Sequence, residues 1–136
     1  MSPQALLKFA LAAFGAVFLL VYPLAIVWPS GWAWHAGPPD DSQYFMMIVG
    51  VYATLGVFLL MAARDPQLHR TLIWFTVWSS VVHGAIMAVQ SMPAEHHGHL
   101  LGDVPALFLV AGVLGGLLVW SDTGKGKTAS MQYPVR

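Results

Sequence analysis

The stretch SQYFMMIVGVYATLGVFLLMAA, residues 42–63, decides the fold because it is long, apolar and free of charged side chains. As an α-helix it would extend about 33 Å, enough to cross the ~30 Å hydrocarbon core of a bilayer. Three further stretches have similar uncharged cores, which places the expected spans at residues 5–28, 42–63, 66–92 and 104–121. The sequence therefore predicts an all-α integral membrane protein, a bundle of four transmembrane helices.

Composition supports this fold class and excludes several functions. The 136 residues are 57% hydrophobic and only 9% charged, whereas soluble domains carry about 25% charged residues. Formal net charge is zero, so we expect no nucleic-acid partner, and the expected partner is the lipid bilayer. The chain has no cysteine, which excludes disulfides, thiolate metal sites and thiol redox chemistry.

The distribution of positive charge predicts the orientation in the membrane. Threading the chain through the four spans places the Lys and Arg residues on one side, and the loops 28–41 and 92–103 on the other side contain neither. Because basic residues concentrate on the cytoplasmic side, both termini are expected in the cytoplasm. We expect one transmembrane domain at residues 1–122 and a polar, disordered cytoplasmic tail at 123–136.

The second and third expected spans each carry a stripe of polar and small side chains at steps of four and three residues. This spacing keeps one face of a helix against a neighbour, and polar faces turn inward in lipid. We therefore expect the two stripes to face each other or to line the bundle interior. His83 lies deep in its span. It either joins helices as a neutral, hydrogen-bonded imidazole, or it binds a ligand or a metal ion or takes part in proton transfer. The expected ligand-binding seam comprises His83, Ser80, Thr76, Met87, Gln90, Gln43, Met47 and Thr54.

The loop before the fourth expected span gathers histidine and carboxylate side chains. Imidazole and carboxylate suit divalent transition metals, and Zn or Cu is the cofactor that the pattern favours. The spacing matches no metalloenzyme signature, so a solvated connector without metal is the alternative. The candidate metal ligands are Glu95, His96, His97, His99, Asp103 and His35.

The fourth expected span contains Gly112-x-x-x-Gly116. Small residues at this spacing let two helix backbones approach closely, so these glycines indicate a helix-packing face. The pattern does not choose between packing within one protomer and packing in a homo-oligomer.

Residues 44–120 resemble a family of short, four-span bacterial membrane proteins that is known only as a domain of unknown function. The motifs that carry the resemblance are YATLG at 52–56, RDP at 64–66, WSSVVHG at 78–84 and HLLGD at 99–103. The resemblance implies a location in the bacterial inner (cytoplasmic) membrane. It implies no activity and no catalytic residues.

These patterns favour a small bacterial polytopic membrane protein that binds a ligand or a metal ion through the seam around His83 and the outer histidine cluster. The alternative is a non-catalytic accessory or assembly subunit of a larger membrane complex, or of a homo-oligomer. A small channel or carrier is the second alternative. We recognise no catalytic residue set, and the sequence leaves open whether the chain is an enzyme.

Overall fold

The computed structural model describes residues 1–33, 35, 37–92 and 94–131, and the side chains of all of these except 94–96 and 124–131. This described part is helical and connected by turns, without a β-strand. The expected all-α fold class is confirmed. In chain order the elements are α1 (Pro3–Leu19), α2 (Val21–Val27), α3 (Pro29–Trp32), η1 (Pro39–Asp41), α4 (Gln43–Ala62), α5 (Arg70–Gln90), η2 (Ala94–Leu100) and α6 (Asp103–Met131).

Three helices, α4, α5 and α6, are each long and apolar enough to cross a membrane. Helices α1 and α2 together make a fourth candidate span if the pair is one broken crossing, bent by 57°. The break falls at Leu20. Pro23 explains it, because a helix running straight through proline would lose the hydrogen bond to the Leu19 carbonyl and would clash with it.

Capping side chains start two of these helices. The Ser2 hydroxyl accepts a hydrogen bond from the Ala5 N–H at 3.2 Å, and Pro3 occupies the first turn of α1. The Ser42 hydroxyl accepts from the Phe45 N–H at 3.1 Å at the start of α4. Each cap satisfies one backbone donor that the first helical turn leaves unpaired.

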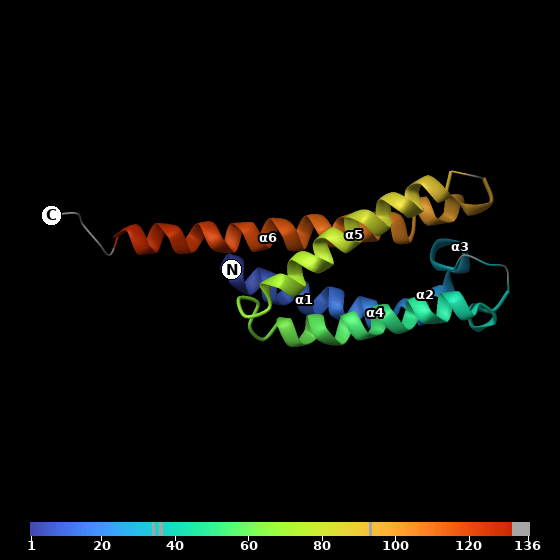
Figure 1. The fold of residues 1–136 in the computed structure, drawn as a ribbon, viewed down its shortest axis with the longest axis horizontal. Helices are drawn as coiled ribbons and strands as arrows, with labels where there is room; N and C mark the ends of the chain where they lie inside the picture. The colour runs from blue at the N-terminus through green and yellow to red at the C-terminus, as the bar shows by residue number, and fades with distance from the viewer. Residues whose placement is uncertain (34, 36, 93, 132–136) are drawn as a thin grey trace.

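Helices that follow each other in the sequence do not always pack against each other. Helix α1 packs against α4 and α6, and α5 packs against α6. Helices α4 and α5 diverge from their connection (Figure 1). The start of α1, this connection and the late part of α6 lie at one end of the bundle, which we call the terminal end. Helix α3 and η2 lie at the opposite end, the α3 end (Figure 1).

The side chains that are most completely buried concentrate toward the terminal end. They come from the start of α1, the end of α4, the start of α5 and the later turns of α6. Since lipid is as apolar as these side chains, close van der Waals packing holds the helices together here. The largest fully buried side chains of this core are Leu7, Leu11, Leu59, Ile73, Leu114 and Leu118.

Two glycines let α1 and α4 touch backbone to backbone. A Cβ on Gly56 would lie 2.7 Å from the Gly15 carbonyl oxygen, and a Cβ on Gly15 would lie 2.9 Å from the Gly56 carbonyl oxygen. Neither position has room for a side chain, so this pair sets the spacing of the two helices. Gly112 and Gly116 face open space in this protomer, where an added Cβ would meet no described atom within 4 Å, so their packing in a homo-oligomer stays a prediction.

The start of α5 differs from the expected boundary. The span was expected from residue 66, but α5 begins at Arg70. The Asp65 carboxylate accepts a hydrogen bond from the Gln67 N–H at 3.2 Å and so closes a turn of its own before the helix. An aspartate ahead of a proline therefore marks a loop turn here and not the helix cap.

The end of α6 differs as well. A disordered tail was expected from residue 123, whereas the helix continues to Met131. Extending an existing helix costs far less than nucleating one, and the next proline, Pro134, comes only after that point. Residues 132–136 of the expected tail lie outside the described residues.

Candidate ligand-binding cavity

A cavity of about 930 Å³ lies between the helices in the half of the bundle toward the α3 end. Six helices contribute to its walls, α1, α2, α3, α4, α5 and α6. The walls are mainly aliphatic and aromatic, and a small number of polar groups interrupt them. This combination of size and lining is typical of sites for small organic ligands. The polar side chains of the lining include Ser42, Tyr52, Ser79, His83, Gln90 and Asp103.

A hydrogen-bonded pair, Tyr52 and His83, lines this cavity. The Tyr52 hydroxyl lies 2.9 Å from His83 Nδ1, which joins α4 to α5 across the bundle. The same pair lines a second, smaller cavity of about 260 Å³. Phe18 of α1 packs edge-on against the Tyr52 ring, with the ring centroids 5.0 Å apart. The pair is therefore held from three helices.

The two proton arrangements of this pair both present a hydrogen-bond donor. If the Tyr52 hydroxyl donates to Nδ1, the His83 proton sits on Nε2. If Nδ1–H donates to the tyrosine oxygen, the hydroxyl proton of Tyr52 remains available and Nε2 can accept. In both arrangements the pair keeps one donor for a bound molecule, while its internal hydrogen bond lowers the cost of holding polar groups in an apolar site.

The stripe expected on the third span points inward, as its helical spacing predicts. Thr76, Ser80 and Met87 are buried, and His83 is half-buried against the cavity. Gln90 is exposed and lies at the cavity lining. This face of α5 therefore meets the bundle interior.

The stripe expected on the second span points away from it. Gln43, Met47 and Thr54 are exposed on α4, and the Thr54 hydroxyl donates to the Gly50 carbonyl of its own helix at 2.9 Å. Gln43 and Thr54 therefore do not meet the stripe of α5, whose Ser80 and His83 line the smaller cavity. Met47 does line the smaller cavity.

The outer histidines occupy separate positions. His99 is buried, its Nδ1 lies 3.0 Å from Asp103 Oδ2, and its Nε2–H donates to the Ala33 carbonyl at 3.1 Å. His97 is exposed and donates from Nε2 to the Met92 carbonyl at 2.9 Å. His35 donates in the same way to the Pro38 carbonyl at 2.7 Å.

The expected metal cluster stays a prediction. Among the residues whose side chains are described, no three histidine or acidic side chains come together as a metal site. The side chains of Glu95 and His96 are outside that description. Both ring nitrogens of His99 already have protein partners, so in this arrangement His99 offers no lone pair to a metal.

At the α3 end, two glycines let η2 and the residues that follow it pack closely against α3. A Cβ on Gly98 would collide with the Ser30 backbone, and one on Gly102 would collide with the Gly31 backbone. The loop thus approaches α3 more closely than any side chain allows. Together with the His99 hydrogen bond to Ala33, this contact holds η2 against α3 at the α3 end.

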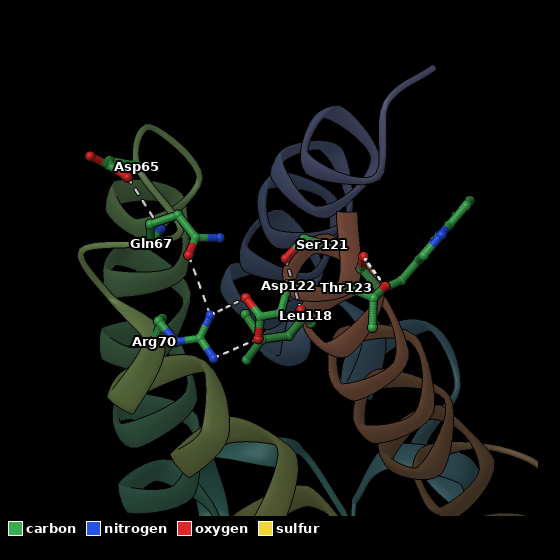
Figure 2. A network of polar contacts seen from close by, with 8 residues as sticks. Asp65, Gln67, Arg70, Leu118, Ser121, Asp122 and Thr123 are labelled. Atoms are coloured by element: carbon green, nitrogen blue, oxygen red, sulfur yellow. Dashed lines mark hydrogen bonds and ion pairs between the residues drawn. The ribbon is translucent and has the colours of Figure 1, made fainter. Parts of the chain in front are cut away.

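An ion pair joins α5 and α6 at the terminal end, away from the cavity. Arg70 Nη2 lies 2.7 Å from Asp122 Oδ2, and Nη1 contacts the other carboxylate oxygen as well as the Gln67 side chain. Figure 2 shows this fork between the first turn of α5 and the late turns of α6. Bidentate geometry of this kind fixes two helices in orientation as well as in distance.

Sequence reasoning missed the partner of His83 and the aromatic lining. Tyr52 lies on the buried face of α4 with Phe45, Gly56 and Leu59, which are spaced by seven, four and three residues. That apolar spacing was readable, but the polar residues of the opposite face were taken as the inward side. Trp32 also lines the cavity, and nothing in its local sequence distinguishes it from a membrane-interface tryptophan.

Fold and site together define an all-helical, membrane-compatible protein with an apolar cavity between its helices. Residues 1–132 match a family of unknown function, DUF6632, and the chain belongs to that family. The resemblance to a family of unknown function is thereby confirmed and extends over nearly the whole chain, whereas the bacterial origin and the four spans stay predictions. No curated protein and no solved structure matches the chain. A functional conclusion must therefore come from the cavity itself.

Proposed function

We propose that this protein crosses a bacterial inner membrane four times and binds a small, mainly apolar molecule in the cavity beside Tyr52 and His83. The bent pair of α1 and α2 supplies the first crossing, and α4, α5 and α6 supply the others. The protein acts by holding its ligand within the membrane, and no catalytic step is part of the proposal.

Charge supports an orientation with the terminal end in the cytoplasm. Lys8, Arg64 and Arg70 all lie toward that end, at the start of α1 and around the α4–α5 connection. The segments at the α3 end carry Asp40, Asp41, Glu95 and Asp103, and they contain no Lys or Arg. Since basic residues concentrate on the cytoplasmic side, the cavity would lie in the outer half of the membrane.

One observation carries the binding proposal: a hydrogen-bonded Tyr52–His83 pair lines an apolar cavity of about 930 Å³. A polar side chain in a membrane interior costs free energy unless it is hydrogen-bonded to the protein or to a ligand. Polar side chains at such positions therefore often mark functional sites. Packing alone would be served better by aliphatic residues that filled the space. A cavity large enough for an organic molecule, with a donor in its wall, is what a binding site requires.

The test is binding of N-phenyl-1-naphthylamine, a fluorophore whose emission rises in apolar cavities, to the purified protein in lipid nanodiscs. Ala106 is half-buried and lines the cavity, so Ala106→Phe fills the space without removing a polar group. We expect saturable binding to the wild type above empty nanodiscs, and its loss in Ala106→Phe.

Ala85→Phe is the matched control, because Ala85 is exposed on α5 outside the cavity lining. It should bind the fluorophore as the wild type does. Binding that is absent from the wild type, or equal in the Ala106→Phe and Ala85→Phe proteins, would contradict the proposal. Thermal unfolding of all three proteins checks that the phenylalanines have not disrupted the bundle.

A second candidate is an accessory subunit that associates with another membrane protein or with itself. The observation favouring it is the outward face of α4, where Gln43 and Thr54 are exposed, together with Gly112 and Gly116 on the open face of α6. Polar and small residues facing lipid are typical of helix–helix contacts in membranes. A single-species, monomeric mass in nanodiscs would argue against self-association.

A further inference from the structure

Asp103 is the acidic side chain in the described lining of the cavity, and one of its oxygens is unused. The residue is 8% exposed and lines the cavity at the start of α6. Oδ2 lies 3.0 Å from His99 Nδ1, whereas Oδ1 is buried and has no hydrogen-bond partner among the described residues. A buried acceptor without a donor costs about 1–3 kcal/mol, so such an atom calls for an explanation.

The surroundings hold this carboxyl group in one orientation. His99 anchors Oδ2, and its own Nε2–H is tied to the Ala33 carbonyl at 3.1 Å. Gly98 and Gly102 clamp the same loop against α3. A carboxylate in the first turn also benefits from the dipole of α6. That benefit, together with the nearby backbone N–H groups of Asp103 and Val104, explains why an acidic residue is tolerated there, but neither N–H has hydrogen-bond geometry to Oδ1.

The charge of the lining limits what could supply that donor. Asp103 contributes a carboxyl group, and no Lys or Arg lies among the described lining residues. An anionic head group would therefore meet an oxygen acceptor with no cation to offset it. Aromatic rings of Trp32, Phe45 and Tyr52 line the same space, and their faces favour cationic or neutral groups over anions.

We propose that Asp103 Oδ1 accepts a hydrogen bond from the head group of the bound molecule, so that the ligand is an amphiphile with an N–H or O–H donor and not an anion. This inference rests on the proposed ligand-binding function and adds the ligand's chemical class. The apolar body of the ligand would occupy the space between α1, α4 and α5, with its head toward the start of α6.

The test is displacement of N-phenyl-1-naphthylamine from the protein in nanodiscs by four compounds with one chain length: decylamine, 1-decanol, decyl methyl ether and decanoate. In the wild type we expect the amine and the alcohol to compete about three- to tenfold better than the ether, the effect of one hydrogen bond, and decanoate to compete worst. Equal competition by the alcohol and the ether, or strong competition by decanoate, would overturn the assignment.

Two variants assign the preference to Asp103. Lipid partitioning of each compound is the same for every protein, so ratios between variants isolate the site. Asp103→Leu should remove the preference for the alcohol over the ether. Asp103→Asn should keep it, because the amide can donate to His99 Nδ1 and still present an oxygen to the cavity. Unchanged selectivity in Asp103→Leu, or loss of the alcohol preference in Asp103→Asn, would contradict the proposal.

If Asp103→Leu does not fold, the wild-type series remains decisive once each competition constant is corrected for the partitioning of that compound into empty nanodiscs. The outcomes also separate the two proposals from each other. A wild type that binds no fluorophore refutes the cavity as a binding site. A wild type that binds it without head-group selectivity leaves the cavity standing and refutes the role of Asp103 alone.

Discussion

Replacing Gly56 with alanine tests whether the α1–α4 crossing is set by backbone contact. The new Cβ would lie 2.7 Å from the Gly15 carbonyl oxygen, while ordinary contact begins near 3.4 Å, so the two helices must separate by roughly 0.7 Å. Overpacking of this kind costs about 1–3 kcal/mol. Alanine recovers about 0.5–1 kcal/mol through its higher helix propensity, which leaves Gly56→Ala about 0.5–2 kcal/mol less stable than the wild type.

Gly50→Ala is the matched control, because it changes the same residue type in the same helix where no described atom lies within 4 Å. Its stability should rise by about 0.5–1 kcal/mol from propensity alone. The propensity term cancels between the two variants, so their difference, about 1–3 kcal/mol, reports the overpacking. SDS titration of the protein in mixed micelles, followed by circular dichroism, measures both. Equal stability of the two alanine variants would refute the backbone contact at Gly56.

Three further predictions follow from the polar contacts and the charge distribution. Arg70→Gln should lower stability by at most about 1 kcal/mol, since its ion pair with α6 is partly exposed, and a larger loss would show that the pair is more shielded than the structure indicates. His99→Ala should lower stability by about 1–3 kcal/mol because it removes two buried hydrogen bonds, whereas His97→Ala should leave stability unchanged. EDTA should not alter the stability of either variant. If EDTA destabilised the untagged wild type as much as His99→Ala does, a metal site would be indicated instead. In this cysteine-free chain, a membrane-impermeant maleimide should label Asp40→Cys in intact spheroplasts and Leu68→Cys only after lysis, and the reverse pattern would invert the orientation.

Apolar length was sufficient to predict the helical, membrane-compatible fold. A long uncharged stretch such as residues 42–63 has few structural alternatives, because only a helix satisfies its backbone in lipid. The boundaries were less readable, since they depend on local hydrogen bonds. Asp65 could cap a helix or close a turn, and only the three-dimensional contact with Gln67 decides for the turn.

The candidate site was half predictable. The inward face of α5, with His83, followed from helical spacing and the cost of polar groups in lipid. The inward face of α4 did not, because it is marked by glycine and aromatic residues and not by polar ones. Gly56 packs on α1 and Tyr52 reaches His83, whereas Thr54 satisfies its hydroxyl within its own helix and can therefore face outward.

Asp103 was singled out as a metal ligand for its type and its neighbours in sequence. Its place in the cavity depends on the docking of the 94–102 loop on α3 through Gly98 and Gly102. Taken from the sequence alone, two glycines at this spacing indicate only that a regular helix is unfavourable. Contacts between distant segments of this kind leave no local periodic signal.

The most direct test of the cavity's role is a crystal structure of the wild-type protein grown from a lipidic mesophase. We expect elongated density between α1, α4 and α5, with its polar end within hydrogen-bond distance of Asp103 Oδ1 or of the Tyr52–His83 pair. A cavity closed by repacked side chains, with Tyr52 and His83 separated, would contradict ligand binding as the function of this protein.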